Sequence, residues 1–267
     1  MYRIQCLTPG FRKIVFSIFL LVGIFLPKAH AQNATPLELT TPRGAKINVV
    51  VNYPEVEKQS KTCPAIIIAP GQGYHMDMPL IRGIAEGAAK DGIAAFRFNW
   101  HYFTASIQPS PDRVHENEDM KSVIDFVKTD KKIDPSRIVL AGKSLGSIVC
   151  YANFRGNPNL AGLFLLTPIC LNDQNMNTLY PDLAKVTIPT MILLGNKDNF
   201  GNLGVLYRNL QTAGNNIVTV VFPGDHSLNV EKVGESEISR KNNENVELAV
   251  SITLHWLNHI FDEHSKK

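Results

Sequence analysis

The residues with the clearest chemistry form a Gly-x-Ser-x-Gly motif at residues 142–146, with Ser144 at its centre. The motif follows an apolar stretch at residues 137–141, which predicts a buried strand, and precedes an apolar helix that runs through residue 154. In a strand–turn–helix of this kind a serine hydroxyl stands exposed at a sheet edge as a nucleophile. Glycine is needed on both sides because the turn is tight and side chains there would collide with the strand and the helix.

A serine hydroxyl is a poor nucleophile at neutral pH, so a base must take its proton and a carboxylate must orient that base. Asp198 follows a strand predicted over residues 191–194, and His226 follows a strand predicted over residues 217–222. The order serine, acid, histidine and the position of each residue after a strand bring all three to one edge of a parallel sheet. The sequence therefore predicts a catalytic triad of Ser144, Asp198 and His226.

Two other carboxylates are alternatives for the acid. Asp173 follows the strand predicted over residues 163–166, and some hydrolases of this kind take their acid from that position. Asp225 is next to His226 and ranks third because neighbouring side chains normally point in different directions. Taken singly, Asp198 would be an ordinary turn aspartate and His226 a surface histidine; the agreement of three placements favours the triad.

The oxyanion formed during attack needs two backbone or side-chain donors. One is predicted to be the N–H of Leu145, at the positive end of the helix that begins after Ser144. The other is predicted to be the N–H of Gln72, since the glycines in residues 71–73 let the backbone approach a substrate closely. The alternative is that these glycines only form a tight turn.

No cofactor or metal site is expected. The letters Gly-Lys-Ser in residues 142–144 suggest a phosphate-binding loop, but that motif needs a glycine where Arg137 stands. After the first 31 residues the cysteines are Cys63, Cys150 and Cys170, and they lie too far apart for a zinc pattern or a disulfide framework. We expect them to be small buried apolar residues, although the spacing leaves one disulfide open without selecting a pair.

Strand-like and helix-like segments alternate along the chain, which predicts an α/β fold with a mostly parallel sheet covered on both faces. Residues 99–115 contain two prolines and no periodicity, and predict a long loop. The predicted strands are residues 37–41, 46–53, 65–69, 93–98, 137–141, 163–166, 191–194 and 217–222, and the predicted helices are residues 80–90, 116–129, 145–154 and 244–261.

With these motifs placed, the chain resembles the α/β-hydrolase superfamily, in its dienelactone-hydrolase-like branch. The resemblance rests on residues 70–73, 96–98, 142–146, 195–198 and 224–226. It implies a mostly parallel central sheet of about eight strands with helices on both faces, no large lid domain, and hydrolysis through an acyl-enzyme. The chain departs from the family in two places: Ser144 stands where dienelactone hydrolases have cysteine, and Pro70-Gly71 stands where many relatives have His-Gly.

Residues 1–31 have the features of a secretion signal. A basic start precedes 13 uncharged apolar residues at 14–26, and Ala29-His30-Ala31 is a small-x-small cleavage site. The apolar run is shorter than the roughly 20 residues that cross a bilayer. We therefore expect a secreted or periplasmic domain of residues 32–267 that is not held in a membrane. Cleavage changes the net charge from +3 to −1, so no nucleic-acid partner is indicated.

The substrate is the least defined part of the prediction. Residues 172–187 are too few for a lipase-type lid, so we expect an open pocket and a small-molecule, short-chain ester. Residues 100–103 are aromatic. Either they line this pocket, or they only pack in the core. An exported peptidase or amidase with the same triad, and a non-catalytic binding protein with this fold, are the alternatives; the oligomeric state is not indicated.

Overall fold

The computed structural model describes residues 34–55, 62–157, 159–230 and 235–264. All of them belong to one unit, Gln32–Lys267. The predicted secretion signal and its cleavage site lie outside the described residues. Within the described ranges, none of the helices combines the length and the hydropathy that crossing a membrane requires.

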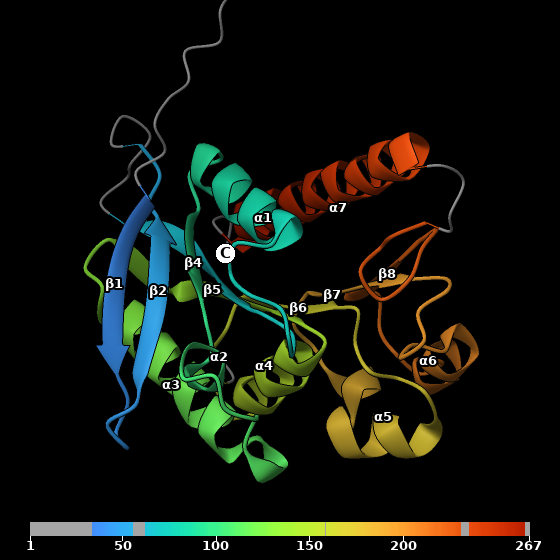
Figure 1. Cartoon of the computed structure of the whole chain (residues 1–267), viewed down its shortest axis with the longest axis horizontal. Coiled ribbons are helices and arrows are strands. Elements are labelled where there is room, and N and C mark those ends of the chain that lie inside the picture. Colours follow the sequence, from blue (N-terminus) through green and yellow to red (C-terminus); the bar gives the residue numbers. More distant parts are fainter. Residues whose placement is uncertain (1–33, 56–61, 158, 231–234, 265–267) are drawn as a thin grey trace, which may run out of the picture. The chain divides into compact units, whose positions relative to one another are not determined.

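The described residues form an eight-stranded sheet in the order β1-β2-β4-β3-β5-β6-β7-β8 (Figure 1). The pairs β1–β2 and β2–β4 are antiparallel, and every pair from β4 through β8 is parallel. The mostly parallel sheet of about eight strands is thus confirmed. The strands are β1 Ala34–Thr40, β2 Lys46–Asn52, β3 Cys63–Ala69, β4 Ala94–Phe98, β5 Ile133–Lys143, β6 Gly162–Leu166, β7 Thr190–Gly195 and β8 Ile217–Phe222.

The central strands are apolar on both sides because helices cover both faces of the sheet. Every residue of β3 is buried. Its side chains alternate between two cores, with Ile66 and Ile68 in one and Ile67 in the other. This explains why the continuous apolar run predicted a strand correctly.

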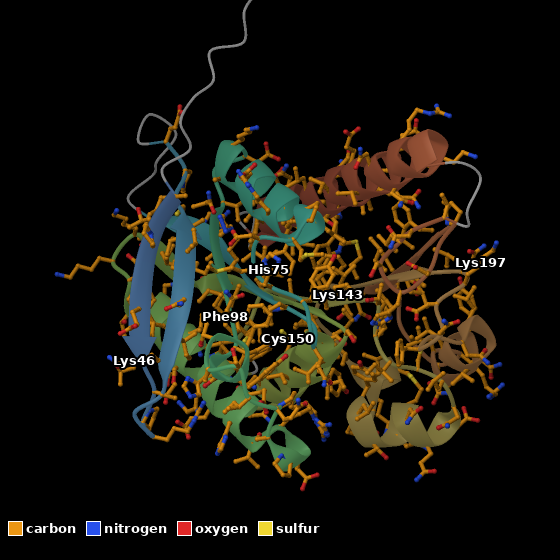
Figure 2. The ribbon with its side chains drawn as sticks, viewed as in Figure 1. Lys46, His75, Phe98, Lys143, Cys150 and Lys197 are labelled. Carbon is orange, nitrogen blue, oxygen red and sulfur yellow. The ribbon has the colours of Figure 1, made fainter. Side chains whose placement is uncertain are left out.

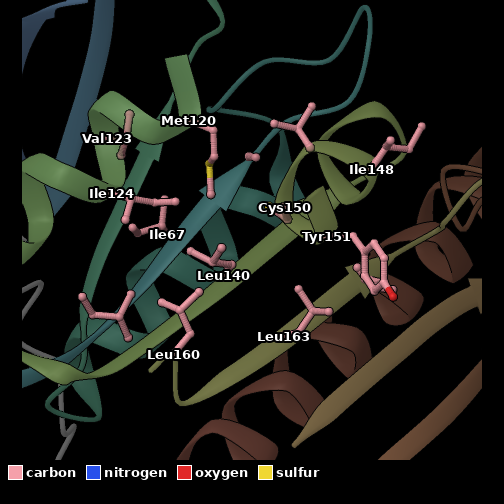
Figure 3. Close-up of a cluster of buried hydrophobic side chains, with 14 of the residues drawn as sticks. Ile67, Met120, Val123, Ile124, Leu140, Ile148, Cys150, Tyr151, Leu160 and Leu163 are labelled. Atoms are coloured by element: carbon pink, nitrogen blue, oxygen red, sulfur yellow. The ribbon is translucent and has the colours of Figure 1, made fainter. Parts of the chain in front are cut away.

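Two layers of helices form these cores (Figure 1). On one face α1 (Pro79–Lys90) packs with α7 (Glu235–His264), and on the other lie α3 (Val114–Thr129) and α4 (Leu145–Arg155). Two shorter helices, α5 (Asp173–Leu179) and α6 (Leu203–Asn209), add Met176, Val205 and Leu206 to the second core. Figure 3 shows part of this core, where Met120, Val123 and Ile124 of α3 lie over the sheet.

Several sequence predictions of local structure were wrong. The predicted loop at residues 99–115 contains α2 (His101–Thr104) and a 3-10 helix (Pro111–Arg113), and α3 begins at Val114. Both helices are too short to show a helical period in the sequence. The helices α5 and α6, seven residues each, were missed for the same reason. The last helix begins at Glu235 and not at residue 244, because its polar first turns have no apolar stripe.

Candidate active site

Ser144 occupies the turn between β5 and α4 in a backbone conformation that few side chains adopt. Its φ is 51° and its ψ is −116°. The N–H of Ser144 donates to the carbonyl of Leu166 at 2.9 Å, and its carbonyl accepts from the N–H and the hydroxyl of Ser147 at 2.9 and 2.6 Å. Neighbouring structure thus holds a strained residue in place, as is common for functional residues.

The two glycines of the motif are required by sterics. A Cβ at Gly142 would lie 2.2 Å from the carbonyl oxygen of Gly146. A Cβ at Gly146 would lie 2.5 Å from the carbonyl oxygen of Ala69, at the end of β3. Both distances are far shorter than any tolerated contact, so the structure supports the reason given for these glycines from the sequence.

The loop after β3 packs directly on Ser144. A Cβ at Gly71 would lie 3.2 Å from the Cβ of Ser144. The next residues form a turn in which the N–H of Tyr74 donates to the carbonyl of Gly71 at 3.2 Å and Gly73 has a φ of +68°. Gln72, a predicted oxyanion donor, therefore lies in the loop beside the serine.

The second predicted donor, Leu145, is the first residue of α4, where backbone N–H groups lack partners within the helix. In the described part of the chain, no hydrogen bond uses the N–H of Leu145 or of Gln72. Both groups are therefore available to a ligand.

His226 and Asp198 form a hydrogen-bonded pair. The Nδ1 atom of His226 lies 2.9 and 2.8 Å from the two carboxylate oxygens of Asp198. The carboxylate is fully buried, while the imidazole is 20% exposed. A carboxylate at Nδ1 favours the tautomer with the proton on that nitrogen, which leaves Nε2 free to accept a proton.

Neighbouring residues fix this pair. The N–H of Phe200 donates to Asp198 at 2.7 Å, and the Phe200 ring lies edge-on to the imidazole with centroids 4.8 Å apart. The loops after β7 and β8 also touch, because a Cβ at Gly195 would lie 2.3 Å from the carbonyl oxygen of Gly224. Contacts within and between the two loops thus fix the orientation of the Asp198 and His226 side chains.

Neither alternative acid bonds to His226. Asp173 is exposed in the first turn of α5 and accepts hydrogen bonds from Arg208 at 2.9 Å and Asn209 at 2.7 Å. The hydrogen bond from Arg208 lowers the pKa of Asp173. Asp225 accepts from the backbone of its own loop, at the N–H groups of residues 227 and 229. Of the three candidate acids, Asp198 is the one that the fold brings to His226.

Sequence reasoning assigned no role to Lys143, the residue before the serine. Its side chain is buried, and its Nζ donates to the carbonyl of His226 at 2.8 Å and to the hydroxyl of Thr167 at 3.1 Å. Burial lowers the pKa of Lys143 to about 8, against the opposing effect of Asp198 and Asp225. Figure 2 labels it in the interior, in contrast to the exposed Lys46 and Lys197. The sequence feature that could have indicated this burial is a lysine at the end of an apolar strand.

Tyr180 is a second residue that sequence reasoning missed. Its buried hydroxyl bonds to the hydroxyl of Ser147 at 2.7 Å and accepts from the N–H of Ile169 at 3.1 Å. Since Ser147 in turn bonds to the carbonyl of Ser144, this network connects the serine turn to the segment after β6.

The aromatic residues after β4 divide between the two expected roles. Trp100 is fully buried, and its indole N–H donates to the carbonyl of Pro70 at 2.8 Å, which anchors the loop that carries Gln72. Tyr102 and Phe103 line a cavity of about 250 Å³ that Gln72 also borders. Trp100 therefore packs in the core, and Tyr102 and Phe103 line a cavity next to the Gln72 loop whose lining does not include Ser144 or His226.

No cluster of three or more metal-ligating side chains occurs among the described residues. Cys63, Cys150 and Cys170 are buried and not joined in disulfides. Burial raises the pKa of each thiol, and that of Cys170 to about 11. The expectation of small buried residues agrees with this arrangement.

Comparison with known proteins gives a family match and one curated relative. A family model described as an alpha/beta hydrolase domain matches residues 62–258. The quorum-quenching protein AidA of Acinetobacter baumannii is 29% identical over 143 residues, which is 52% of this chain and 45% of that protein. The match thus spans less than half the length of this relative.

Three solved structures illustrate the fold that this chain shares with known proteins. An α/β serine hydrolase homologue from Coxiella burnetii has a TM-score of 0.62 and 20% identity, over 81% of this chain and 96% of its own. A serine hydrolase without a lid from Xanthomonas campestris has a TM-score of 0.62 and 20% identity, over 85% and 94%. Est1E from Butyrivibrio proteoclasticus, also solved with ferulic acid bound, has a TM-score of 0.63 and 16% identity, over 84% and 99%.

Proposed function

Because the chain belongs to the α/β hydrolase family, we propose that it is a serine hydrolase that cleaves a small carboxylic ester. The observation that carries the proposal is the hydrogen-bonded His226–Asp198 pair, whose histidine carbonyl accepts a hydrogen bond from Lys143, the residue next to Ser144. A partly exposed serine in a strained turn and an oriented histidine base are the two parts that nucleophilic ester cleavage needs.

Each residue has one role in this reaction. The hydroxyl of Ser144 attacks the ester carbonyl while His226 takes its proton, and Asp198 holds and stabilises the imidazolium. The N–H groups of Leu145 and Gln72 bind the oxyanion. The imidazolium then protonates the leaving alkoxide as the ester C–O bond breaks. Water, deprotonated by His226, attacks the acyl-enzyme and releases the acid and Ser144.

The substrate is proposed to be small. Between β6 and β7, residues 167–189 hold only α5 and the 3-10 helix Leu183–Lys185. The cavity of about 250 Å³ beside Gln72 is lined by Tyr102, Phe103 and Ile107. Its lining includes Gln72 but not Ser144 or His226, so we propose it as the neighbouring pocket for the acyl group, and its volume is below the roughly 300 Å³ at which typical pockets for drug-sized ligands start. We therefore propose short-chain acyl esters, with an amide or peptide bond as the alternative for the same triad.

The first experiment is hydrolysis of p-nitrophenyl esters from acetate to palmitate by the wild type and by Ser144→Ala. We expect serine-dependent turnover that is fastest on the short chains, and fluorophosphonate labelling that Ser144→Ala abolishes. Labelling that persists in Ser144→Ala would overturn the assignment of the nucleophile. Simple lactones belong in the panel because they are cyclic esters.

A folded wild type that neither turns over esters nor reacts with the probe would support the non-catalytic alternative. A wild type that reacts with the probe and cleaves only p-nitroanilides would support the amidase. A faster rate on palmitate than on acetate would contradict the small substrate.

We further propose that the protein is exported, on the basis of the signal-like residues 1–31. The proposal predicts a mature protein that begins at Gln32 and is found in the periplasm or the medium. The intact mass of the protein purified from each fraction tests this, and a full-length chain that stays in the cytoplasm would contradict it.

A further inference from the structure

Lys143 is a buried lysine at the meeting point of several loops. Its backbone lies at the end of β5, where it pairs with Leu166 of β6, and its side chain is 3% exposed. Groups from the ends of four other strands face its ammonium group. They are Tyr74 after β3, Thr167 after β6, Asp198 after β7, and Asp225 and His226 after β8.

The strongest of these contacts is to the backbone of the proposed base. The Nζ of Lys143 donates to the carbonyl of His226 at 2.8 Å and to the hydroxyl of Thr167 at 3.1 Å. The ammonium also lies 4.8 Å from the centre of the Tyr74 ring, within the range of a cation–π contact.

Fold stability does not account for a lysine at this place. Removing an ammonium from water is costly, and an apolar side chain of similar length would fill the space without that cost. The lowered pKa of about 8 reflects this cost, which the nearby Asp198 and Asp225 only partly offset. A side chain that is costly to bury and still forms several contacts is expected at places where function requires those contacts.

The location of the contacts shows what that requirement is. Lys143 is covalently joined to Ser144, and its Nζ is bonded to the carbonyl of His226. One side chain therefore connects two members of the proposed triad. The loop that carries His226 follows β8, which is an edge strand and is supported by a neighbour on one side only. An anchor from the central strand β5 fixes this loop relative to the serine.

We propose that Lys143 is a positioning residue that holds His226 at the correct distance and orientation from Ser144. The proposal rests on the serine hydrolase function proposed above. Because Lys143 is buried, we expect its loss to lower the rate of the chemical step and to leave substrate binding nearly unchanged.

The test compares Lys143→Met with the wild type in ester hydrolysis. Methionine is similar in length and apolar, and it removes both hydrogen bonds. We expect kcat to fall by about 50-fold, since a displacement near 1 Å can cost about 100-fold, while KM changes less than about threefold. Lys128→Met is the matched control, because Lys128 on α3 also donates one side-chain hydrogen bond, to Asn157, away from the site. Fluorophosphonate labelling of Lys143→Met should slow in parallel with kcat.

A pH profile gives a readout that a merely structural role would not change. As pH rises through about 8, Lys143 loses its charge and its hydrogen bonds lose their charge assistance. The wild-type kcat should therefore fall by about threefold above this pH, because charge-assisted bonds are about twice as strong as neutral ones. Lys143→Arg keeps its charge, so the decline should move to higher pH.

Each outcome supports or contradicts the proposal. The proposal would be overturned if Lys143→Met had the same kcat as the wild type. It would also be overturned if Lys128→Met lost as much kcat as Lys143→Met. If Lys143→Met does not fold by circular dichroism, Lys143→Arg decides, and an alkaline decline unchanged in that variant would overturn the proposal. A wild type without serine-dependent turnover contradicts the proposed function instead, so the two failures are distinguishable.

Discussion

Two regions at the same edge of the sheet owe their conformations to different forces. The triad loops, defined here as residues 142–147, 195–201 and 224–229, are shaped by backbone contacts that exclude any side chain at four glycines, Gly142, Gly146, Gly195 and Gly224. The α2 segment, defined here as residues 99–113, is held by the carboxylates of Asp119 and Glu116 in α3, and Asp119 in turn pairs with the distant Arg43. The first kind of constraint is visible in a local sequence motif, and the second is not.

The charged contacts of the α2 segment start from the turn between β1 and β2. Arg43 in that turn forms an ion pair with Asp119 of α3 at 2.5 Å. The other oxygen of Asp119 accepts from the N–H of His101, the first residue of α2, at 2.9 Å. Glu116 accepts from the N–H and the hydroxyl of Ser110 at 3.0 and 2.7 Å. The comparison indicates that the triad loops depend on close backbone packing and the cavity wall on side-chain charge.

The largest expected effect is on kcat, and it distinguishes two candidate acids. Asp198 lies within the triad loops, and Asp173 lies outside them. Asp198→Asn keeps the shape but favours the wrong tautomer of His226, and we expect kcat to fall by about 10⁴-fold. Asp173→Asn is the control, since Asp173 is exposed and bonded to α6, and should change kcat less than about twofold. Steady-state kinetics on a short ester measures both. A comparable loss in the two variants would contradict the assignment of the acid.

The next effect is on folding and tests the steric constraint. Gly142→Ala places a methyl group 2.2 Å from the carbonyl oxygen of Gly146. We expect the free energy of unfolding to fall by about 3 kcal/mol or more, measured by urea titration. Gly156→Ala is the matched control because the nearest atom to its new methyl is 3.6 Å away, and its effect should stay within about 0.5 kcal/mol. If the two variants were equally stable, the turn around Ser144 would be able to move apart to accommodate the methyl group, and the steric constraint would be contradicted.

The same contrast explains what the sequence could predict. Ser144, Asp198 and His226 each follow an apolar strand, and parallel strands end at one edge, so local patterns were enough to predict that all three lie at the same edge of the sheet. The pairing of His226 with Asp198 agrees with that argument. The role of Lys143 could not be predicted in this way, because its contacts are with Thr167 and the backbone of His226, which are distant in sequence.

The α2 segment was predicted as a loop for a related reason. A helix of four residues shows no period, and its conformation depends on Asp119 and Arg43, whose pairing no local pattern indicates. Buried ion pairs of this kind connect elements that sequence reasoning treats separately.

A smaller effect tests the charged contacts. In Arg43→Met the buried carboxylate of Asp119 loses its charged partner and keeps the N–H of His101. We expect the free energy of unfolding to fall by about 2 kcal/mol, below the roughly 3–5 kcal/mol of a fully buried pair because Arg43 is partly exposed. KM should rise about threefold with kcat nearly unchanged, since Tyr102 and Phe103 line the cavity and the triad loops are untouched. Arg82→Met removes an exposed ion pair and is the control. A fall in kcat without a change in KM would contradict the division between the two regions.

The smallest effect is the pH dependence of that loss. Burial raises the pKa of Asp119 above its ordinary value, and Arg43 opposes this rise. Without Arg43 the folded-state pKa should rise further above the unfolded value. A carboxyl whose folded pKa is raised destabilises the fold where it is ionised, and stability returns as pH falls through the folded pKa. Arg43→Met should therefore lose less stability at pH 5 than at pH 8 relative to the wild type. Urea titration at the two pH values measures the difference, and a loss that grows at pH 5 would show that Asp119 is not the carboxylate left unpaired.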